Sequence, residues 1–225
     1  MTDRRRLSGA TADLDRARQC LLLQTRHAVD AQVDVLQIRE RDLEASDLAR
    51  LVTEMVAIAR GSRSRVVVND RLDIALACGA GGVHLRASSI PPFAARSISP
   101  PGFVIGRSVH ALEEAVAVAS DVDYLIAGTV WPSESKPGGP AGPPLLGLPG
   151  LAAIAAAVRV PVLAVGGVTL DRIPGVVSCG SAGVAGIGLF IGSPDDEGGI
   201  ACRATALRRT VEAARARFDT SRTAS

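Results

Sequence analysis

The sequence predicts a TIM (β/α)8 barrel. Short aliphatic runs alternate along the chain with amphipathic stretches of helical period, which is typical of repeated βα units. The 225 residues suit one such barrel domain. Hydrophobic residues make up 47% of the chain and aromatic residues only 3%. Such an aliphatic composition favours parallel strands that are covered on both faces.

Seven strands are predicted where aliphatic residues run together. They cover 33–38, 65–68, 82–85, 104–106, 124–127, 162–165 and 182–187. Eight strands would close a barrel. We therefore expect either that the first strand is truncated or that the native chain begins upstream of Met1.

Eight helices are predicted between and after these strands. They cover 14–29, 45–59, 72–78, 92–97, 112–119, 149–158, 170–177 and 201–218. Ser46 is placed to cap the second of them, and Gly61 to end it. A long Pro- and Gly-rich loop is predicted at 137–144. The tail 219–225 is expected to be disordered, which leaves one domain over residues 1–218.

The charge and cysteine content exclude several classes of protein. A net charge of +2, without basic residues interleaved with aromatic ones, argues against a nucleic-acid partner. No apolar run reaches the ~18 residues of a membrane span and no signal region follows the basic start, so we expect a cytoplasmic protein. The basic run Arg4–Arg6 is interpreted as a solvated terminus. The widely spaced cysteines are expected to be reduced thiols and not a zinc site or disulfide framework; they are Cys20, Cys78, Cys179 and Cys202.

Residues at the carboxyl ends of barrel strands face the active site. The polar residues and glycines at these ends are Gln37, Arg39, Arg41, Asn69, Asp70, Ser108, His110, Thr129, Ser133, Ser135, Lys136, Gly166, Gly167 and Gly188. The cations among them suit a phosphorylated or diphosphorylated substrate, and the glycines let backbone N–H groups approach an anion. His110 is the better candidate for proton transfer, although a role at the helix entry is an alternative. His84 is interpreted equally well as a core histidine.

Several motifs in this order and spacing resemble one family. They read Gln-Ile-Arg-Glu-Arg at 37–41, Val-Asn-Asp-Arg-Leu-Asp-Ile-Ala at 68–75, Gly-Val-His-Leu at 82–85, Ile-Gly-Arg-Ser-Val-His at 105–110, Gly-Thr-Val-Trp-Pro-Ser-Glu-Ser-Lys at 128–136 and Ala-Val-Gly-Gly-Val at 164–168. The chain thereby resembles thiamine phosphate synthase and its relatives, the TenI-type thiazole tautomerases. Thr2–Asp3 also looks like the end of the first strand of that family.

The resemblance implies roles for individual residues. In synthases, the pyrimidine diphosphate is held at the positions of Gln37, Arg39, Arg41, Asn69 and Lys136, magnesium at that of Asp70, and the thiazole phosphate at those of Ser133, Ser135, Gly167, Ile187 and Gly188. We also expect Ser108 and Thr129 to contact the substrate, and His110 and Lys136 to be the catalytic residues.

Three departures from the family pattern bear on the reaction. Ser89 stands where synthases carry a second metal-binding aspartate, Arg41 replaces a lysine, and Thr129 replaces the tautomerase histidine. The first two departures, together with the Arg-Ser-Val-His motif at 107–110, favour a TenI-like thiazole tautomerase, which needs no cofactor. One alternative is thiamine phosphate synthase, which uses Mg²⁺, and another is a non-catalytic regulatory barrel that binds thiazole phosphate. The expected partners are thiazole phosphate and pyrimidine diphosphate, with no membrane, and a homo-oligomer is compatible with the sequence.

Overall fold

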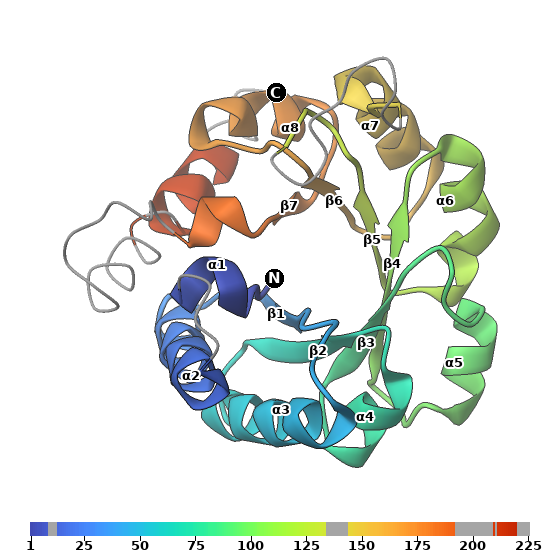
Figure 1. Ribbon diagram of the computed structural model, residues 1–225. Coiled ribbons are helices and arrows are strands. Elements are labelled where there is room, and N and C mark those ends of the chain that lie inside the picture. Colours follow the sequence, from blue (N-terminus) through green and yellow to red (C-terminus); the bar gives the residue numbers. More distant parts are fainter. Residues whose placement is uncertain (9–12, 134–143, 192–208, 210, 220–225) are drawn as a thin grey trace. The chain divides into compact units, whose positions relative to one another are not determined.

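The computed structural model describes residues 1–8, 13–133, 144–191, 209 and 211–219 (Figure 1). The chain divides into two compact units. The first unit comprises Met1–His84, Ser99–Val104 and Ile187–Glu212, and the second comprises Leu85–Ile98, Ile105–Gly186 and Ala213–Ser225. Each unit repeats a parallel strand followed by a helix, so the predicted (β/α)-barrel class is confirmed. The single domain expected for residues 1–218 stays a prediction.

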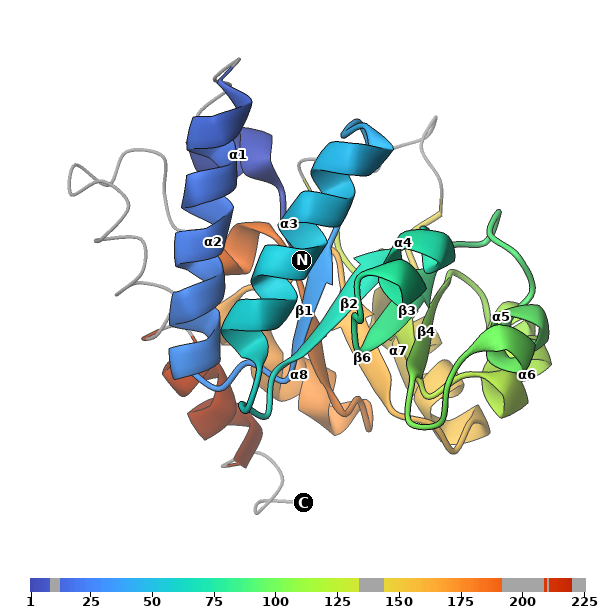
Figure 2. The ribbon, with the colours of Figure 1, turned by 90° about the horizontal axis from the view of Figure 1, so that it is seen from below.

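The first unit is built on β1 (Val35–Ile38), β2 (Arg65–Asn69) and β3 (Gly82–Leu85). β1 pairs in parallel with β2, and β2 with β3. Helices α2 (Leu14–Asp30), α3 (Ala45–Ala59) and α4 (Leu72–Ala77) lie on one side of these strands (Figures 1 and 2). The buried residues of α3 are Leu48, Leu51, Val52, Met55 and Ala59, a spacing that forms one apolar stripe. That stripe is what holds the helix against the sheet.

The second unit contains β4 (Val104–Val109, from Ile105 onward), β5 (Tyr124–Ala127), β6 (Val162–Val165) and β7 (Gly183–Ala185), paired in parallel in chain order. Its helices are α5 (Pro92–Ile98), α6 (Leu112–Val118), α7 (Gly147–Ala157) and α8 (Ile173–Ser178), with 3₁₀ turns at Ala119–Asp121 and Leu170–Arg172. In this unit Gly106 makes room for an aromatic ring, because a Cβ there would lie 2.0 Å from Tyr124 Cζ.

The strands agree closely with the predicted ones among the described residues. The bounds of β3, β5 and β6 are those predicted, whereas β4 runs on to Val109 and β7 covers only Gly183–Ala185. The helix predicted at 170–177 divides into a 3₁₀ turn and α8, which has a proline in its first turn. Proline has no backbone N–H to continue the ladder from the preceding turn. The cap assigned to Ser46 is wrong, because α3 already begins at Ala45 and its cap residue makes no side-chain bond.

The N-terminal segment forms a helix that the sequence did not predict. Helix α1 covers Arg4–Ser8, and Arg4 is only 8% exposed. The interpretation of this basic run as a solvated terminus is therefore wrong for Arg4. Thr2 makes one backbone hydrogen bond beside β1, from its N–H to the carbonyl of Gln37 at 2.8 Å.

At the other end of the chain, residues 211–219 are helical, so the helix extends one residue past its predicted end at 218. Residues 220–225 of the expected tail, and 137–143 of the predicted loop, lie outside the described residues. Cys20, Cys78 and Cys179 are free thiols, and Cys202 is outside the described part. No helix in the described ranges is long and apolar enough to cross a lipid bilayer.

Candidate functional site

In the first unit, two amides meet at the carboxyl ends of β1 and β2. Gln37 Nε2 donates a hydrogen bond to Asn69 Oδ1 at 3.1 Å. Gln37 is 4% exposed, and its Oε1 has no hydrogen-bond partner among the described residues. An unsatisfied buried acceptor costs about 1–3 kcal/mol. A ligand that brings an N–H or O–H donor to this point would remove that cost, so the amide pair has the character of a binding site.

Asp70 follows directly, in a backbone conformation that few residues adopt. Its φ is 67°, in the left-handed region, where aspartate and asparagine are the most tolerated residues after glycine. Its N–H donates to the carbonyl of His84 at 2.9 Å, and its carbonyl accepts from the N–H of Leu72 at 3.1 Å. These two bonds fix the turn that carries the Asp70 carboxylate at the ends of β2 and β3. His84 itself is 2% exposed, which agrees with a core histidine.

The turn offers one carboxylate, that of Asp70, of the kind that binds Mg²⁺ together with substrate oxygens. The described residues contain no group of three or more His, Cys, Asp or Glu side chains that could hold a metal ion. Mg²⁺ is commonly bound by one or two carboxylates together with substrate phosphates and water. Asp70 can supply one such carboxylate, but a site formed by the protein alone is not present in the described ranges.

In the second unit, Ser89 stands at the position where the resemblance expects a second metal-binding aspartate. Its Oγ accepts from the N–H of Arg86 at 2.7 Å and so closes a local turn.

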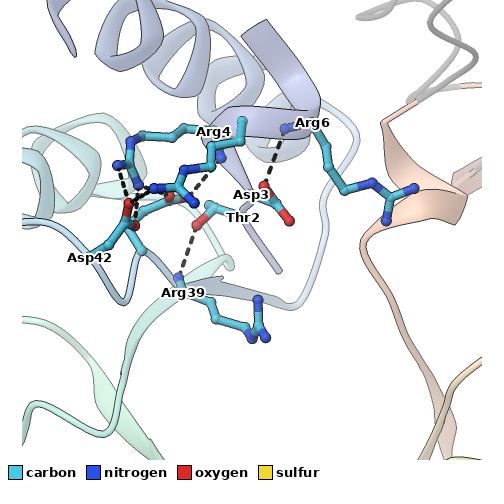
Figure 3. Close-up of polar contacts among 8 residues, drawn as sticks. Thr2, Asp3, Arg4, Arg6, Arg39 and Asp42 are labelled. Carbon is cyan, nitrogen blue, oxygen red and sulfur yellow. Dashed lines mark hydrogen bonds and ion pairs between the residues drawn. The ribbon is translucent and has the colours of Figure 1, made fainter. Parts of the chain in front are cut away.

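The predicted cations Arg39 and Arg41 alternate with two acidic residues, Glu40 and Asp42, that are paired elsewhere. Arg4 Nη1 lies 3.0 Å from Glu40 Oε2 and 2.6 Å from Asp42 Oδ1, and Arg4 Nη2 lies 2.7 Å from Asp42 Oδ2 (Figure 3). Arg5 also pairs with Asp42. Arg39 is half-buried and Arg41 is exposed. The turn after β1 therefore holds its acidic side chains on Arg4.

The electrostatics of this turn follow from those contacts. The hydrogen bonds from Arg4 lower the pKa of Asp42 to about 2. Burial raises the pKa of Glu40, while hydrogen bonds from Thr2 and Arg4 act in the opposite direction. The Arg4 side chain is 10% exposed, and its guanidinium balances the negative charge of two carboxylates. That of Glu40 is buried, and that of Asp42 is partly exposed.

The low pKa of Asp42 predicts how stability changes in acid. A carboxyl whose pKa is lower in the folded than in the unfolded state stabilises the fold above its ordinary value near 4, and loses that contribution as the pH falls toward 2. Asp42→Asn should therefore lower the free energy of unfolding at pH 6 by about 1 kcal/mol or less, because the Asp42 side chain is 40% exposed. Urea unfolding of both proteins from pH 6 to pH 2.5 checks this. The difference between them should shrink below pH 4, and a constant difference would contradict it.

In the second unit, His110 lies at the end of β5 as well as at the end of its own strand, β4. His110 Nδ1 makes a hydrogen bond with the carbonyl of Gly128, and the His110 N–H donates to Glu114 Oε2 at 2.7 Å. When Nδ1 carries the proton for this bond, Nε2 carries the lone pair. Thr129, which follows Gly128 in the chain, is 9% exposed. His110 thus lies beside Thr129, the position at which the resemblance places a histidine in tautomerases. Ser108, another predicted site residue on β4, is half-buried.

The double glycine after β6 forms a tight turn against a tryptophan. Gly166 and Gly167 have φ values of 95° and 60°, and the N–H of Trp131 donates to the carbonyl of Gly166 at 3.1 Å. Arg172 Nη1 donates to the carbonyl of Gly167, and the Arg172 guanidinium carbon lies 5.0 Å from the centre of the Trp131 ring. Both glycines were predicted from the sequence as site residues, whereas Arg172 was not. A cation five residues after a strand-end glycine is the signal that could have found it.

The remaining predicted residues divide between the units. Ser133 ends the described part of its loop, and Ser135 and Lys136 lie outside the described residues. Ile187 and Gly188 belong to the first unit, at the start of the 3₁₀ turn Gly188–Phe190. A Cβ at Gly188 would lie 3.4 Å from Arg6 Nη2, so the guanidinium of Arg6 sits over this glycine. The first unit brings together Gln37, Asn69 and Asp70, and the second His110, Gly128 and Thr129.

Comparison with known proteins shows similarity over most of the chain. The family described as thiamine monophosphate synthase matches residues 10–190. A thiamine-phosphate synthase of Methanoregula boonei is 39% identical over 194 residues, covering 86% of this chain and 87% of the relative. One of Methanoculleus marisnigri is 39% identical over 192 residues, covering 85% and 88%. The solved structure of thiamine phosphate pyrophosphorylase from Pyrococcus furiosus is 30% identical, with a TM-score of 0.71 over 86% of this chain and 90% of that one.

Proposed function

The chain belongs to the thiamine monophosphate synthase family, and from this premise we propose that it is a thiamine phosphate synthase. The observation that carries the proposal is 39% identity to a relative of that name over 86% of the chain. This identity favours the synthase over the TenI-like tautomerase that the sequence motifs predict. The tautomerase prediction rested on Ser89, Arg41 and the Arg-Ser-Val-His motif at 107–110. An arginine in place of a lysine keeps the cation that a diphosphate needs.

The pyrimidine diphosphate is proposed to bind at the end of β1 and β2. The buried Oε1 of Gln37 can accept a hydrogen bond from an amino group on the pyrimidine, while Asn69 holds the Gln37 amide in place. Arg39, Arg41 and Lys136 are proposed to bind the diphosphate oxygens through charge-assisted hydrogen bonds. The resemblance proposes Ser133, Ser135, Gly167, Ile187 and Gly188 for the thiazole phosphate, and Ser108 and Thr129 remain proposed contacts to the substrate.

In the proposed reaction, the bond between the pyrimidine methylene and the diphosphate breaks, and the thiazole nitrogen attacks the methylene carbon. The products are thiamine phosphate and pyrophosphate. A magnesium ion on Asp70 and the diphosphate would supply positive charge to the leaving group. Arg39, Arg41 and Lys136 neutralise the rest of the charge that develops there. The paired amides Gln37 and Asn69 orient the pyrimidine so that its methylene faces the nitrogen.

An assay with both substrates tests this function. The purified protein is incubated with hydroxymethylpyrimidine diphosphate and thiazole phosphate, with Mg²⁺ and with EDTA. We expect thiamine phosphate and pyrophosphate in equal amounts, and in the presence of Mg²⁺ only. Absence of thiamine phosphate under saturating substrates and Mg²⁺ would overturn the proposal.

The contact between His110 and Gly128 supports a second candidate, a thiazole tautomerase. Such an enzyme moves one proton of a carboxylated thiazole phosphate and needs no metal. His110, beside Thr129, offers a base in place of the missing histidine. Metal-independent interconversion of the tautomers that His110→Ala abolishes would support this candidate. Binding of thiazole phosphate without either reaction would support the non-catalytic barrel instead.

A further inference from the structure

Two anion-binding candidates and two carboxylates alternate in the turn after β1. Arg39 and Arg41 are separated by Glu40 and followed by Asp42. A carboxylate next to a site for a diphosphate weakens that site in two ways. It repels the ligand, and it competes with the ligand for the neighbouring arginines. The turn can bind a diphosphate well only if both carboxylates are neutralised and directed elsewhere.

Arg4 does both. Its guanidinium makes two hydrogen bonds to Asp42, at 2.6 and 2.7 Å, and one to Glu40 at 3.0 Å. Its backbone N–H donates to the other oxygen of Glu40 at 3.1 Å. The side chains of Arg4 and Glu40 are 10% and 3% exposed, so water screens their interaction little. A planar guanidinium that binds two carboxylates at once also fixes their relative position.

Thr2 ties the same segment to Arg39. The N–H of Thr2 donates to the carbonyl of Gln37 at 2.8 Å, and Thr2 Oγ1 accepts from the N–H of Arg39 at 2.9 Å. Figure 3 shows the side chain of Arg39 pointing away from the bonds between Arg4 and Asp42. The N-terminal segment therefore contacts the turn at both its start and its end, and leaves the side chain of Arg39 directed away from the carboxylates.

We propose that Arg4 is a positioning residue for the diphosphate site, which acts by holding Glu40 and Asp42 away from Arg39. The inference rests on the proposed function, because that function places the diphosphate on Arg39 and Arg41. Arg4 touches no substrate in this proposal. Among the described residues, its loss leaves Glu40 without an arginine and Asp42 with Arg5 alone. Both carboxylates can then compete for Arg39, and the turn can move.

The variant Arg4→Met removes the charge and keeps an apolar stem of similar length. We expect it to raise the KM for the pyrimidine diphosphate by roughly 10- to 100-fold, the cost typical of a small displacement of binding groups. The KM for thiazole phosphate should stay unchanged. Arg4→Lys should restore only part of the loss, because one ammonium cannot reproduce the bidentate contact with Asp42 and the bond to Glu40 together.

Arg18→Met is the matched control. Arg18 lies in α2 of the same unit, and its Nη1 bonds both oxygens of Glu54 in α3, at 2.5 and 2.7 Å. Both variants lose a guanidinium paired with carboxylates, so both should lower the melting temperature. Only Arg4→Met should change the KM for the pyrimidine diphosphate. Equal KM values in the two variants would overturn the proposal and assign Arg4 a structural role alone.

A rescue experiment tests whether the charges of Glu40 and Asp42 cause the loss of affinity in Arg4→Met. In the Arg4→Met background, Glu40→Gln and Asp42→Asn together remove the competing charges, and should recover part of the lost affinity for the diphosphate. The binding of inorganic pyrophosphate with Mg²⁺, measured by calorimetry on the wild type, Arg4→Met and Arg18→Met, gives a readout that needs no turnover. If the wild type forms no thiamine phosphate but binds pyrophosphate more tightly than Arg4→Met, the proposed function fails while the role of Arg4 stands. If all three proteins bind it equally, the role of Arg4 fails.

Discussion

Asp70→Asn is expected to lower the Mg²⁺-dependent formation of thiamine phosphate by about 100- to 1,000-fold, the loss typical when one preorganised electrostatic contact is removed from a reacting centre. Asp70 is the single carboxylate that the resemblance assigns to magnesium, and Ser89 takes the place of the second. An ion with only one protein carboxylate depends on it more than an ion with two, so its removal should have a large effect.

Asparagine is the informative replacement because of the backbone at this position. The φ of Asp70 is 67°, a region that asparagine tolerates about as well as aspartate. Asp70→Asn thus removes the charge without adding backbone strain, whereas alanine would change both. The rate is measured against Mg²⁺ concentration, with the melting temperature and thiazole phosphate binding as controls that should not change. A variant as fast as the wild type at every Mg²⁺ concentration would show that the metal is held elsewhere.

Gly167→Ala is expected to lower the free energy of unfolding by about 2–5 kcal/mol. A non-glycine residue in the left-handed conformation costs roughly 1–2 kcal/mol, and overpacking adds about 1–3 kcal/mol. Both apply here, since the φ of Gly167 is 60° and a Cβ would lie 2.4 Å from the carbonyl oxygen of Pro132. Relief of the clash must move the turn or the segment that carries Trp131. Binding of thiazole phosphate should therefore weaken as well.

Gly180→Ala is the control that separates strain from crowding. Gly180 lies in the same unit with a φ of 76°. Among the described residues, a Cβ there would meet only Ala155 Cβ, at an ordinary 3.7 Å. This variant should lose only the strain term, roughly 1–2 kcal/mol, and should bind thiazole phosphate as the wild type does. Urea unfolding of both variants measures the difference. If both variants lost the same free energy of unfolding, the contact between the new Cβ and the Pro132 carbonyl would be relieved without an energetic penalty.

The features that depend on neighbours in sequence were predictable. The aliphatic runs located β3, β5 and β6 to the residue, because a buried parallel strand needs an unbroken run of apolar side chains. The same holds for α3, whose apolar stripe has a helical period over Ala45–Ala59. The glycines at 166 and 167 and the Asn69–Asp70 pair could also be placed at strand ends, since a strand end is a local property. These features determine the fold class and the chemical character of the site.

Contacts between distant segments were not predictable in this way. From the sequence, Arg4 was interpreted as a solvated terminal residue, because its partners Glu40 and Asp42 lie 36 and 38 residues further along the chain. His110 and Gly128 likewise meet only because β4 and β5 pair in parallel and end at the same edge of the sheet. A residue's charge says that it needs a partner, while the pairing register of the strands decides which partner it has. The βα repeat and the residues proposed to bind phosphate and metal could thus be predicted from local sequence. That the buried Arg4 holds Glu40 and Asp42, the acidic side chains of the turn after β1, follows only from the folded arrangement of the chain.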